Sequence, residues 1–193
     1  AVTMAIMVNA ISIMQERGRL MARPSGIDEH NIFTISSVGF AETFNERVAI
    51  EEDLAALRSL PGVVNAIQSN SVPLSGGGWN MGIQTEPGDD IEGPSVAIYF
   101  VDEHAIDTYG LNLQAGQNFS ATYIMWRELS DTAWPDKAII TRSTAEALYP
   151  DEPDGALGKT VYISGDLPMT ITGIIEQMQA PWNGWEGVER VML

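Results

Sequence analysis

Residues 155–176 read GALGKTVYISGDLPMTITGIIE, and this stretch decides the fold. It contains two short runs, on either side of a Gly-Asp turn, in which apolar and polar residues alternate. The apolar members of the two runs are Val161, Ile163, Met169 and Ile171. A period of two is typical of strands that bury one face, so the stretch predicts a β-hairpin. Gly158 and Gly173 stand at its ends, where a side chain would obstruct a turn or a bulge.

The residues before this hairpin predict a buried strand and then a short helix. They read DKAIITRSTAEALYPDEP at positions 136–153, with the strand expected at 138–141. Ser143 and Glu146 have the spacing of a capping box, which would begin the helix. The prolines at 150 and 153 would end it, because proline does not continue a helix.

Further elements are expected nearer the N-terminus and at the C-terminus. Helical spacing of Ile50, Leu54 and Leu57 predicts a helix over 46–60 with these three residues on its buried side. Asp102 would cap a second helix, and Gly110 would stop it. Strands are expected at 31–40, 63–71, 95–101 and 188–193, and a loop is expected at 75–94.

Residues 1–14, AVTMAIMVNAISIM, are almost all apolar and are followed by the polar Gln15 and the charged residues Glu16, Arg17 and Arg19. A helix that crosses a bilayer needs about 20 apolar residues, so this run is too short alone. We interpret it as the outer end of a membrane helix, since the chain starts at Ala1 rather than at a methionine. A signal-peptide remnant and a buried amphipathic helix are the alternatives.

The overall charge limits the partners that the chain can have. Ten Lys and Arg residues stand against 26 Asp and Glu residues, which gives a formal net charge of −16. This balance argues against nucleic acid as a partner, because its binding depends on Lys and Arg neutralising phosphates, and it also argues against docking on an anionic lipid surface. The absence of cysteine excludes disulfides, cysteine-ligated zinc and thiol catalysis.

The sequence contains no arrangement of residues that predicts catalysis, a cofactor or a metal. His30 and His104 are its two histidines, and neither belongs to a zinc or nucleophile motif. The glycines at 76–78 are followed by Trp79 rather than by the Gly-Lys-Ser/Thr of a phosphate-binding loop. Asp89, Asp90 and Glu92 lack the spacing of an EF-hand, so a solvated loop is favoured over a calcium site.

Large aromatic residues in Gly- and Pro-rich segments are the remaining candidates for a binding surface. The candidate partner or ligand surface consists of Trp79, Trp134, Trp182 and Trp185 together with Asp89 and Asp90. The alternative for the tryptophans is that they fill the interface between two lobes.

Several short motifs occur in the order found in one family of membrane proteins. These motifs are ARPSGIDEHNIFTI (22–35), LRSLPGVVNA (57–66), YFVDEHAIDTYGLNLQAGQNF (99–119), ALYP (147–150), LGK (157–159) and TITGII (170–175). In this order they resemble the extracytoplasmic core domain of MacB/FtsX-type ABC transporter permeases, and together they cover roughly residues 22–178.

The resemblance implies an α+β fold with two lobes and a long N-terminal helix. One lobe would be a ferredoxin-like β-α-β unit, called porter-like, and the other would be mixed and rich in strands. The implied division is a stalk at 1–21, the first part of the porter-like lobe at 22–94, the second lobe at 95–178 and a strand returning to the first lobe at 179–193.

The resemblance also implies a mechanical role in the inner membrane, with this domain on the outer side. ATP hydrolysis would occur on a separate or fused ATP-binding subunit, and a second permease copy would complete the transporter. The N-terminal helix would contact the membrane, and an adaptor or peptide could bind outside. The alternative function is an extracellular sensor that captures cationic peptides with its acidic loops and tryptophans.

Overall fold

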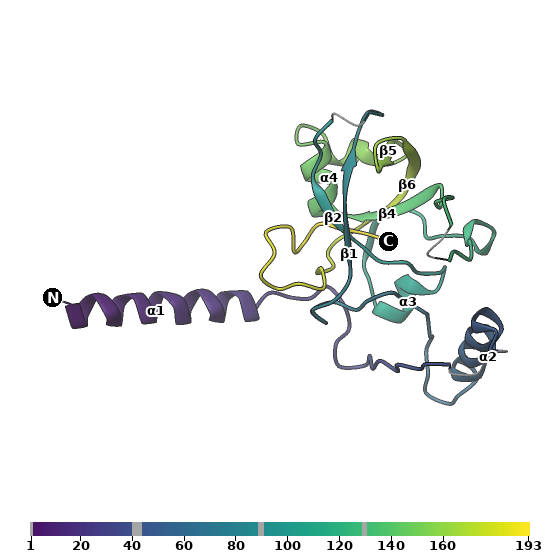
Figure 1. Cartoon of the computed structure of the whole chain (residues 1–193), viewed down its shortest axis with the longest axis horizontal. Helices are drawn as coiled ribbons and strands as arrows, with labels where there is room; N and C mark the ends of the chain where they lie inside the picture. The colour runs from purple at the N-terminus through teal and green to yellow at the C-terminus, as the bar shows by residue number, and fades with distance from the viewer. Residues whose placement is uncertain (1, 40–43, 89–90, 129–130) are drawn as a thin grey trace.

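The computed structural model describes residues 2–39, 44–88, 91–128 and 131–193. Figure 1 shows a body of strands, a long helix that projects from one side of it and a second helix set apart at the opposite corner. The helices are α1 (Val2–Met21), α2 (Glu46–Arg58), α3 (Ala105–Tyr109) and α4 (Arg142–Leu148), with 3-10 turns η1 (Ala121–Tyr123) and η2 (Pro153–Ala156). The expected α+β class and the long N-terminal helix are confirmed.

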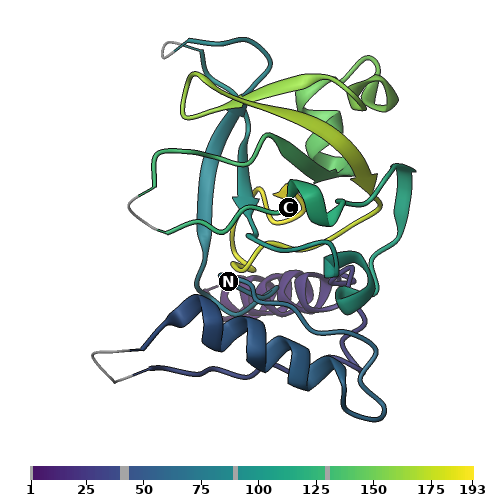
Figure 2. The same cartoon turned by 90° about the vertical axis from the view of Figure 1, so that its right-hand side faces the viewer.

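Seven strands form one sheet in the order β3-β6-β4-β7-β2-β1-β5. They are β1 (Trp79–Gln84), β2 (Ser95–Ile98), β3 (Leu113–Gly116), β4 (Lys137–Thr141), β5 (Thr160–Ile163), β6 (Leu167–Ile175) and β7 (Val191–Met192). Because β5 also pairs with β6, six of the strands close into a barrel, and β3 adds to the far half of β6. Figure 2 shows the barrel above α2, with α4 on its outer side.

The predicted hairpin is confirmed as β5 and β6, which pair from Thr160↔Thr170 to Ile163↔Leu167. Its alternation is also as expected, since residues 161, 163, 169 and 171 are buried and the residues between them are more exposed. Opposite β4 the register shifts by one, so that Ile139 faces Gly173 while Ala138 faces Ile171. The extra residue makes a bulge next to Gly173, as the glycine there predicted.

Two apolar clusters lie on opposite faces of the same strands. Ile98, Ile140 and Ile174 belong to one cluster, which extends to α4. Their chain neighbours Tyr99, Ile139 and Ile175 belong to the other, which packs against α3 and the C-terminal segment. Successive residues of a strand point to opposite faces, so each central strand contributes to both clusters. These strands therefore read as nearly continuous apolar runs in the sequence.

The expected ferredoxin-like β-α-β unit is not confirmed by the described residues. Residues 31–39 and 63–71 are extended but contain no strand, and α2 between them has no buried residue. An extended segment becomes a strand only where a neighbour accepts and donates its backbone hydrogen bonds. Beside 63–71 a side chain makes that contact instead: Asn70 bonds the carbonyl of Ile98 and the N–H of Phe100.

Three more expectations require correction. The loop expected at 75–94 contains β1, because Met81 and Ile83 turn toward the barrel and its backbone pairs with β2 and β5. The strand expected at 188–193 is shorter than predicted, since β7 covers only Val191–Met192, where it pairs with β2 and β4. The helix α4 begins two residues earlier than the capping box predicted, since Thr141 caps it and Glu146 pairs with Arg142.

No described residue of α1 is buried, and all of them except Leu20 are exposed. Residues 2–14 therefore present their apolar side chains outward rather than to the barrel. In the ranges that the structure describes, no helix is both long enough and apolar enough to cross a membrane.

We predict that Thr141→Val lowers the free energy of unfolding by about 2–3 kcal/mol, because it leaves several buried groups without a partner. The buried Thr141 Oγ1 donates to the carbonyl of Glu189 at 2.7 Å and accepts from the N–H groups of Val191 at 3.1 Å and Thr144 at 3.3 Å. Urea unfolding measures the change. Thr172→Val is the matched control, since Thr172 makes one such bond, to the carbonyl of Ala138; equal losses in both variants would contradict the prediction.

Candidate functional site

The segment that follows α1 is held by the C-terminal part of the chain, and we call this contact the helix joint (residues 22–28 with 177–179). Gln179 donates from its backbone N–H to the carbonyl of Ser25 and from Nε2 to the carbonyl of Pro24, both at 2.9 Å. Gln177 Nε2 donates to the same Pro24 carbonyl. Ser25 and Gln179 are both buried, so α1 meets the barrel through an ordered contact rather than a free linker.

Gly26 is required by the shape of the helix joint. Its φ of +85° lies in the left-handed region, and a Cβ there would be 2.3 Å from the carbonyl oxygen of Gln177. Two residues later, the N–H of Asp28 donates to the carbonyl of Tyr109 at the end of α3. Sequence reasoning treated this Pro-Ser-Gly run only as an entry turn, because its partners are about 150 positions away.

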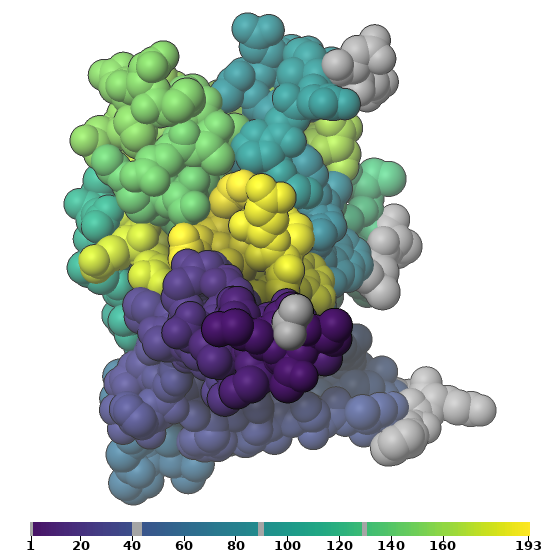
Figure 3. All heavy atoms as spheres, turned by 90° about the vertical axis from the view of Figure 1, so that its left-hand side faces the viewer, coloured from purple at the N-terminus to yellow at the C-terminus, as the bar shows by residue number. Residues whose placement is uncertain are grey.

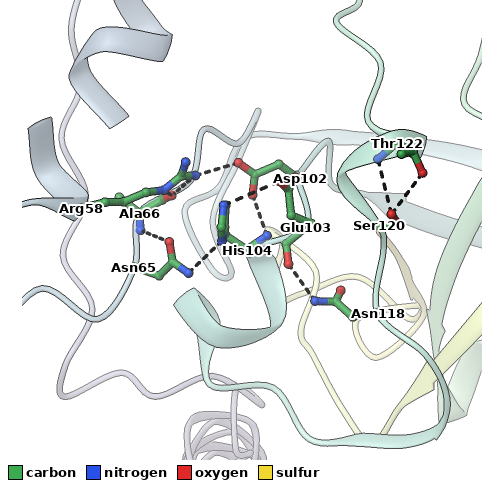
Figure 4. Close-up of polar contacts among 9 residues, drawn as sticks. All are labelled: Arg58, Asn65, Ala66, Asp102, Glu103, His104, Asn118, Ser120 and Thr122. Atoms are coloured by element: carbon green, nitrogen blue, oxygen red, sulfur yellow. Dashed lines mark hydrogen bonds and ion pairs between the residues drawn. The ribbon is translucent and has the colours of Figure 1, made fainter. Parts of the chain in front are cut away.

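A polar clamp attaches the end of α2 and the residues after it to the start of α3 (Figure 4). Arg58 donates to the carbonyl of Ala66 and pairs with Asp102 at 2.9 Å. Asp102 also accepts the N–H of His104, and the His104 ring contacts Asn65 Nδ2 at 3.0 Å through Nδ1. His104 therefore has a structural partner, where the sequence suggested an exposed surface residue.

The clamp matters because α2 has little else to hold it. None of its residues is buried, and its apolar residues Ile50, Leu54 and Leu57 are only partly covered. Burial of an apolar stripe normally fixes a helix on a protein surface. Here the position of α2 depends on polar contacts, chiefly the Arg58–Asp102 pair, whose side chains are 29% and 20% exposed.

A groove of about 1280 Å³ separates α2 from the near end of the barrel. Ile50 and Leu54 line it on the α2 side, and Met169 and Met192 line it on the barrel side. Its third wall is formed by residues 123–128, after β3. The lining is mostly apolar, so the groove could accommodate a bulky apolar group or a stretch of polypeptide.

The tryptophans Trp79 and Trp134 meet beside this groove through Phe100. The ring centroids of Trp79 and Phe100 are 5.6 Å apart, and those of Phe100 and Trp134 are 5.8 Å apart. The Arg127 guanidinium lies 4.5 Å from the Trp134 ring centroid and donates to two carbonyls of its own loop. This arrangement holds the third wall of the groove against the barrel.

Basic residues gather at the groove although the chain is strongly acidic. Arg47 lies 5.9 Å from the Trp126 ring and Lys137 lies 5.7 Å from the Tyr123 ring. With Arg127, the groove lining holds three of the ten Lys and Arg residues in the sequence. The same lining also holds four acidic residues, Glu46, Glu51, Asp102 and Glu128, so the groove presents charges of both signs.

Trp182 and Trp185 form a second aromatic pair, with ring centroids 5.8 Å apart and planes at 86°. Both are half-buried against the cluster that contains Tyr99, whereas Trp134 packs against the other cluster. The predicted tryptophans thus divide into two pairs on different apolar clusters. Asp89 and Asp90 lie outside the described residues.

The described residues offer no catalytic geometry. No group of three or more His, Cys, Asp or Glu residues among them could hold a metal ion. Burial raises the pKa of Tyr99, whose hydroxyl donates to the Gln179 carbonyl at 2.8 Å, so it serves as a neutral structural donor. The pKa of Glu16 is lowered by its bond to Arg19 on the exposed surface of α1.

We predict that Arg58→Gln increases amide hydrogen exchange in α2 several-fold while β4 and β6 keep their protection. The reason is that the variant removes an ion pair and a bidentate contact from a helix that lacks buried residues. Exchange followed by mass spectrometry makes the measurement. Arg47→Gln is the control, because the Arg47–Glu51 pair is exposed and lies within α2; faster exchange throughout the barrel would show that Arg58 supports the whole fold.

A comparison with family models finds that the MacB-like periplasmic core domain matches residues 2–189. A comparison with curated proteins finds no match. Among solved structures, the extracellular domain of the noncanonic ABC-type transporter YknZ from Gram-positive bacteria is 22% identical, with a TM-score of 0.47 over 74% of this chain and 60% of that chain. The periplasmic region of MacB from Actinobacillus actinomycetemcomitans is 16% identical, with a TM-score of 0.44 over 74% of this chain and 62% of that chain.

The chain thus covers less than two thirds of the length of either solved domain. The family match, in contrast, extends over nearly the whole of this sequence, from the start of α1 to the residues before β7. On that match, this chain belongs to the family of MacB-like periplasmic core domains.

Proposed function

We propose that this chain is the external domain of an ABC transporter permease and that it transmits movement from the membrane to the outside. The observation that carries the proposal is the helix joint, which fixes one end of a long, exposed helix to the barrel. A helix of 20 residues is about 30 Å long, so it can act as a lever if its joint is rigid.

The apolar part of α1 supports a membrane location for the free end of this lever. Val2, Met4 and Ile6 are each more than 60% exposed, and apolar residues continue around the helix to Met14. A helix that is apolar on all sides is usually buried in protein or in lipid. The barrel does not cover α1, so we assign its apolar end to the outer side of the inner membrane.

A route for movement runs from α1 to α2 through α3. Tyr109, at the end of α3, accepts the bond from Asp28 in the helix joint. His104 and Asp102, at the start of α3, belong to the polar clamp that holds α2. A displacement of α1 would therefore pass along one short helix to α2 and would change the width of the groove.

The same proposal includes partners outside this chain. ATP would be hydrolysed by a separate or fused ATP-binding subunit, a second permease copy would complete the transporter, and an adaptor or peptide could contact the groove. We keep the division into a stalk at 1–21, a porter-like region at 22–94, a second lobe at 95–178 and a return segment at 179–193 as part of this proposal. The alternative proposal is an external sensor of cationic peptides, which Glu46, Glu51, Asp102 and Glu128 in the groove lining would attract.

The test uses the full permease with its ATP-binding subunit, reconstituted in lipid, with spin labels on α2 and on the barrel. These 193 residues contain no cysteine, so Glu52→Cys and Asp151→Cys supply defined label positions on exposed sites. We expect the distance between the labels to differ between the nucleotide-free and ATP-bound states. Inserting Gly-Gly after Ala22 should abolish that difference while ATP hydrolysis continues, because it makes the lever flexible before the joint.

The same insertion after Pro150, in an exposed loop, is the matched control and should leave the distance change intact. A distance change that persists with the insertion at Ala22 would reject α1 as the lever. Loss of ATP hydrolysis in that variant would also count against the proposal, since it would place the effect in assembly rather than in transmission.

A further inference from the structure

We infer that the barrel face around the end of α1 docks on phospholipid headgroups, through a tryptophan loop (residues 180–188) and an arginine collar (residues 17–23). The inference rests on the proposed function in one respect, namely that the apolar end of α1 enters the bilayer. The occupant of this surface is then the headgroup layer of that same bilayer, and anionic phospholipid is the chemistry that the collar fits.

The tryptophan loop is a rigid projection whose base is part of the helix joint. Ala180 donates to the carbonyl of Val188 at 2.6 Å, which closes the loop, and Leu74 donates to the carbonyl of Ala180. Gln179, the residue before the loop, holds Ser25 and Pro24 just after α1. The loop is therefore fixed next to the point at which α1 leaves the body.

The figures place this loop on the side that α1 projects from. Figure 1 shows the yellow C-terminal segment as the part of the body that extends furthest toward α1. Figure 3 looks at that side along α1 and shows the same yellow segment directly beside the purple helix. A bilayer that receives the free end of α1 would face this loop first.

The residues of the loop suit a boundary between lipid and water. Trp182 and Trp185 are half-buried and stacked edge to face, and Arg190 lies 5.8 Å from the Trp185 ring. Gly187 lets the Trp185 ring lie flat, since a Cβ at Gly187 would be 2.7 Å from it. Tryptophan and arginine gather at membrane interfaces because each combines an apolar body with a polar group.

The arginine collar provides charge complementarity to anionic headgroups. Arg17, Arg19 and Arg23 are three of the ten basic residues in the sequence, and Glu16 is the only acid between Val2 and Arg23. Arg19 is paired with Glu16 at 2.7 Å, whereas the ion pairs found among the described residues include neither Arg17 nor Arg23. In a chain of net charge −16, this local excess of positive charge favours an anionic surface.

The length of α1 is compatible with this placement. If residues 2–14 lie in the hydrocarbon, residues 15–21 cross only about 10 Å before the joint, at about 1.5 Å per residue. The headgroup layer on each side of a bilayer is about 5–8 Å thick, and a tilted helix brings the body closer. The tryptophan loop would thus meet the outer edge of the headgroups.

The test measures tryptophan fluorescence of the 193-residue chain on vesicles of phosphatidylcholine with about one third phosphatidylglycerol, brominated near the headgroup end of the acyl chains. Bromine quenches tryptophan at short range, so the wild-type chain should be quenched. Trp182→Phe with Trp185→Phe should remove most of this quenching, while Trp79→Phe with Trp134→Phe should remove none, because those rings lie at the groove. Arg17→Gln with Arg23→Gln should weaken vesicle binding at least two-fold and make it insensitive to phosphatidylglycerol.

Flotation of the vesicles separates the two possible failures. If the wild-type chain floats with the vesicles but quenching is absent, or is unchanged by the Trp182 and Trp185 substitutions, the docking surface is rejected and membrane anchoring stands. If the wild-type chain floats neither with vesicles of phosphatidylcholine alone nor with vesicles that contain phosphatidylglycerol, both the docking surface and the membrane role of α1 are rejected.

Discussion

The structure depends on the pairing of β6 with three other strands. Its first half hydrogen-bonds to β5, its second half to β3, and β4 pairs along most of its length. Because β6 is long, it can pair with different strands along its two halves. The bulge at Gly173 provides the bend between these halves. Without β6 the strand order would be an open sheet with unpaired edges, so closure of the barrel and burial of both clusters depend on this strand.

Outside the barrel, apolar residues such as Ile27 and Ile67 pack on one apolar cluster, whereas the segment after α1 and the end of α2 are held by polar contacts. The helix joint and the polar clamp consist of amide, carboxylate and guanidinium groups with one partner or two, and each lies at an end of α3. Such contacts are individually weak and break without unfolding the barrel. No residue of α1 or α2 is buried, so the helix joint and the polar clamp are the contacts that attach these helices to the barrel.

Charged residues are distributed unevenly over the molecule, which its net charge does not show. The arginine collar has three basic residues and no acid within 17–23, whereas the groove holds both signs of charge, with Arg127 and Lys137 lying against aromatic rings. A net charge of −16 spread evenly over the surface would repel anionic membranes and other anionic groups alike. In physiological salt, however, charges act only within about 10 Å, so a local cluster of basic residues determines the potential close to it.

Local periodicity and glycine positions in the sequence predicted the β5–β6 hairpin, β2 and β4, because they record which faces of a strand are buried, whereas the α+β class and the long helix α1 were expected from the family resemblance. Only the tertiary structure decided that β1 and β7 complete a barrel, and that residues 31–39 and 63–71 remain unpaired, since pairing depends on neighbours that are distant in sequence. The four candidate tryptophans all lie in Gly- and Pro-rich segments, so the sequence did not distinguish them. The fold places Trp79 and Trp134 beside the groove and Trp182 and Trp185 in the tryptophan loop. Gly26 and Gln179 were not recognisable as a site, because about 150 residues lie between them and only folding brings them together.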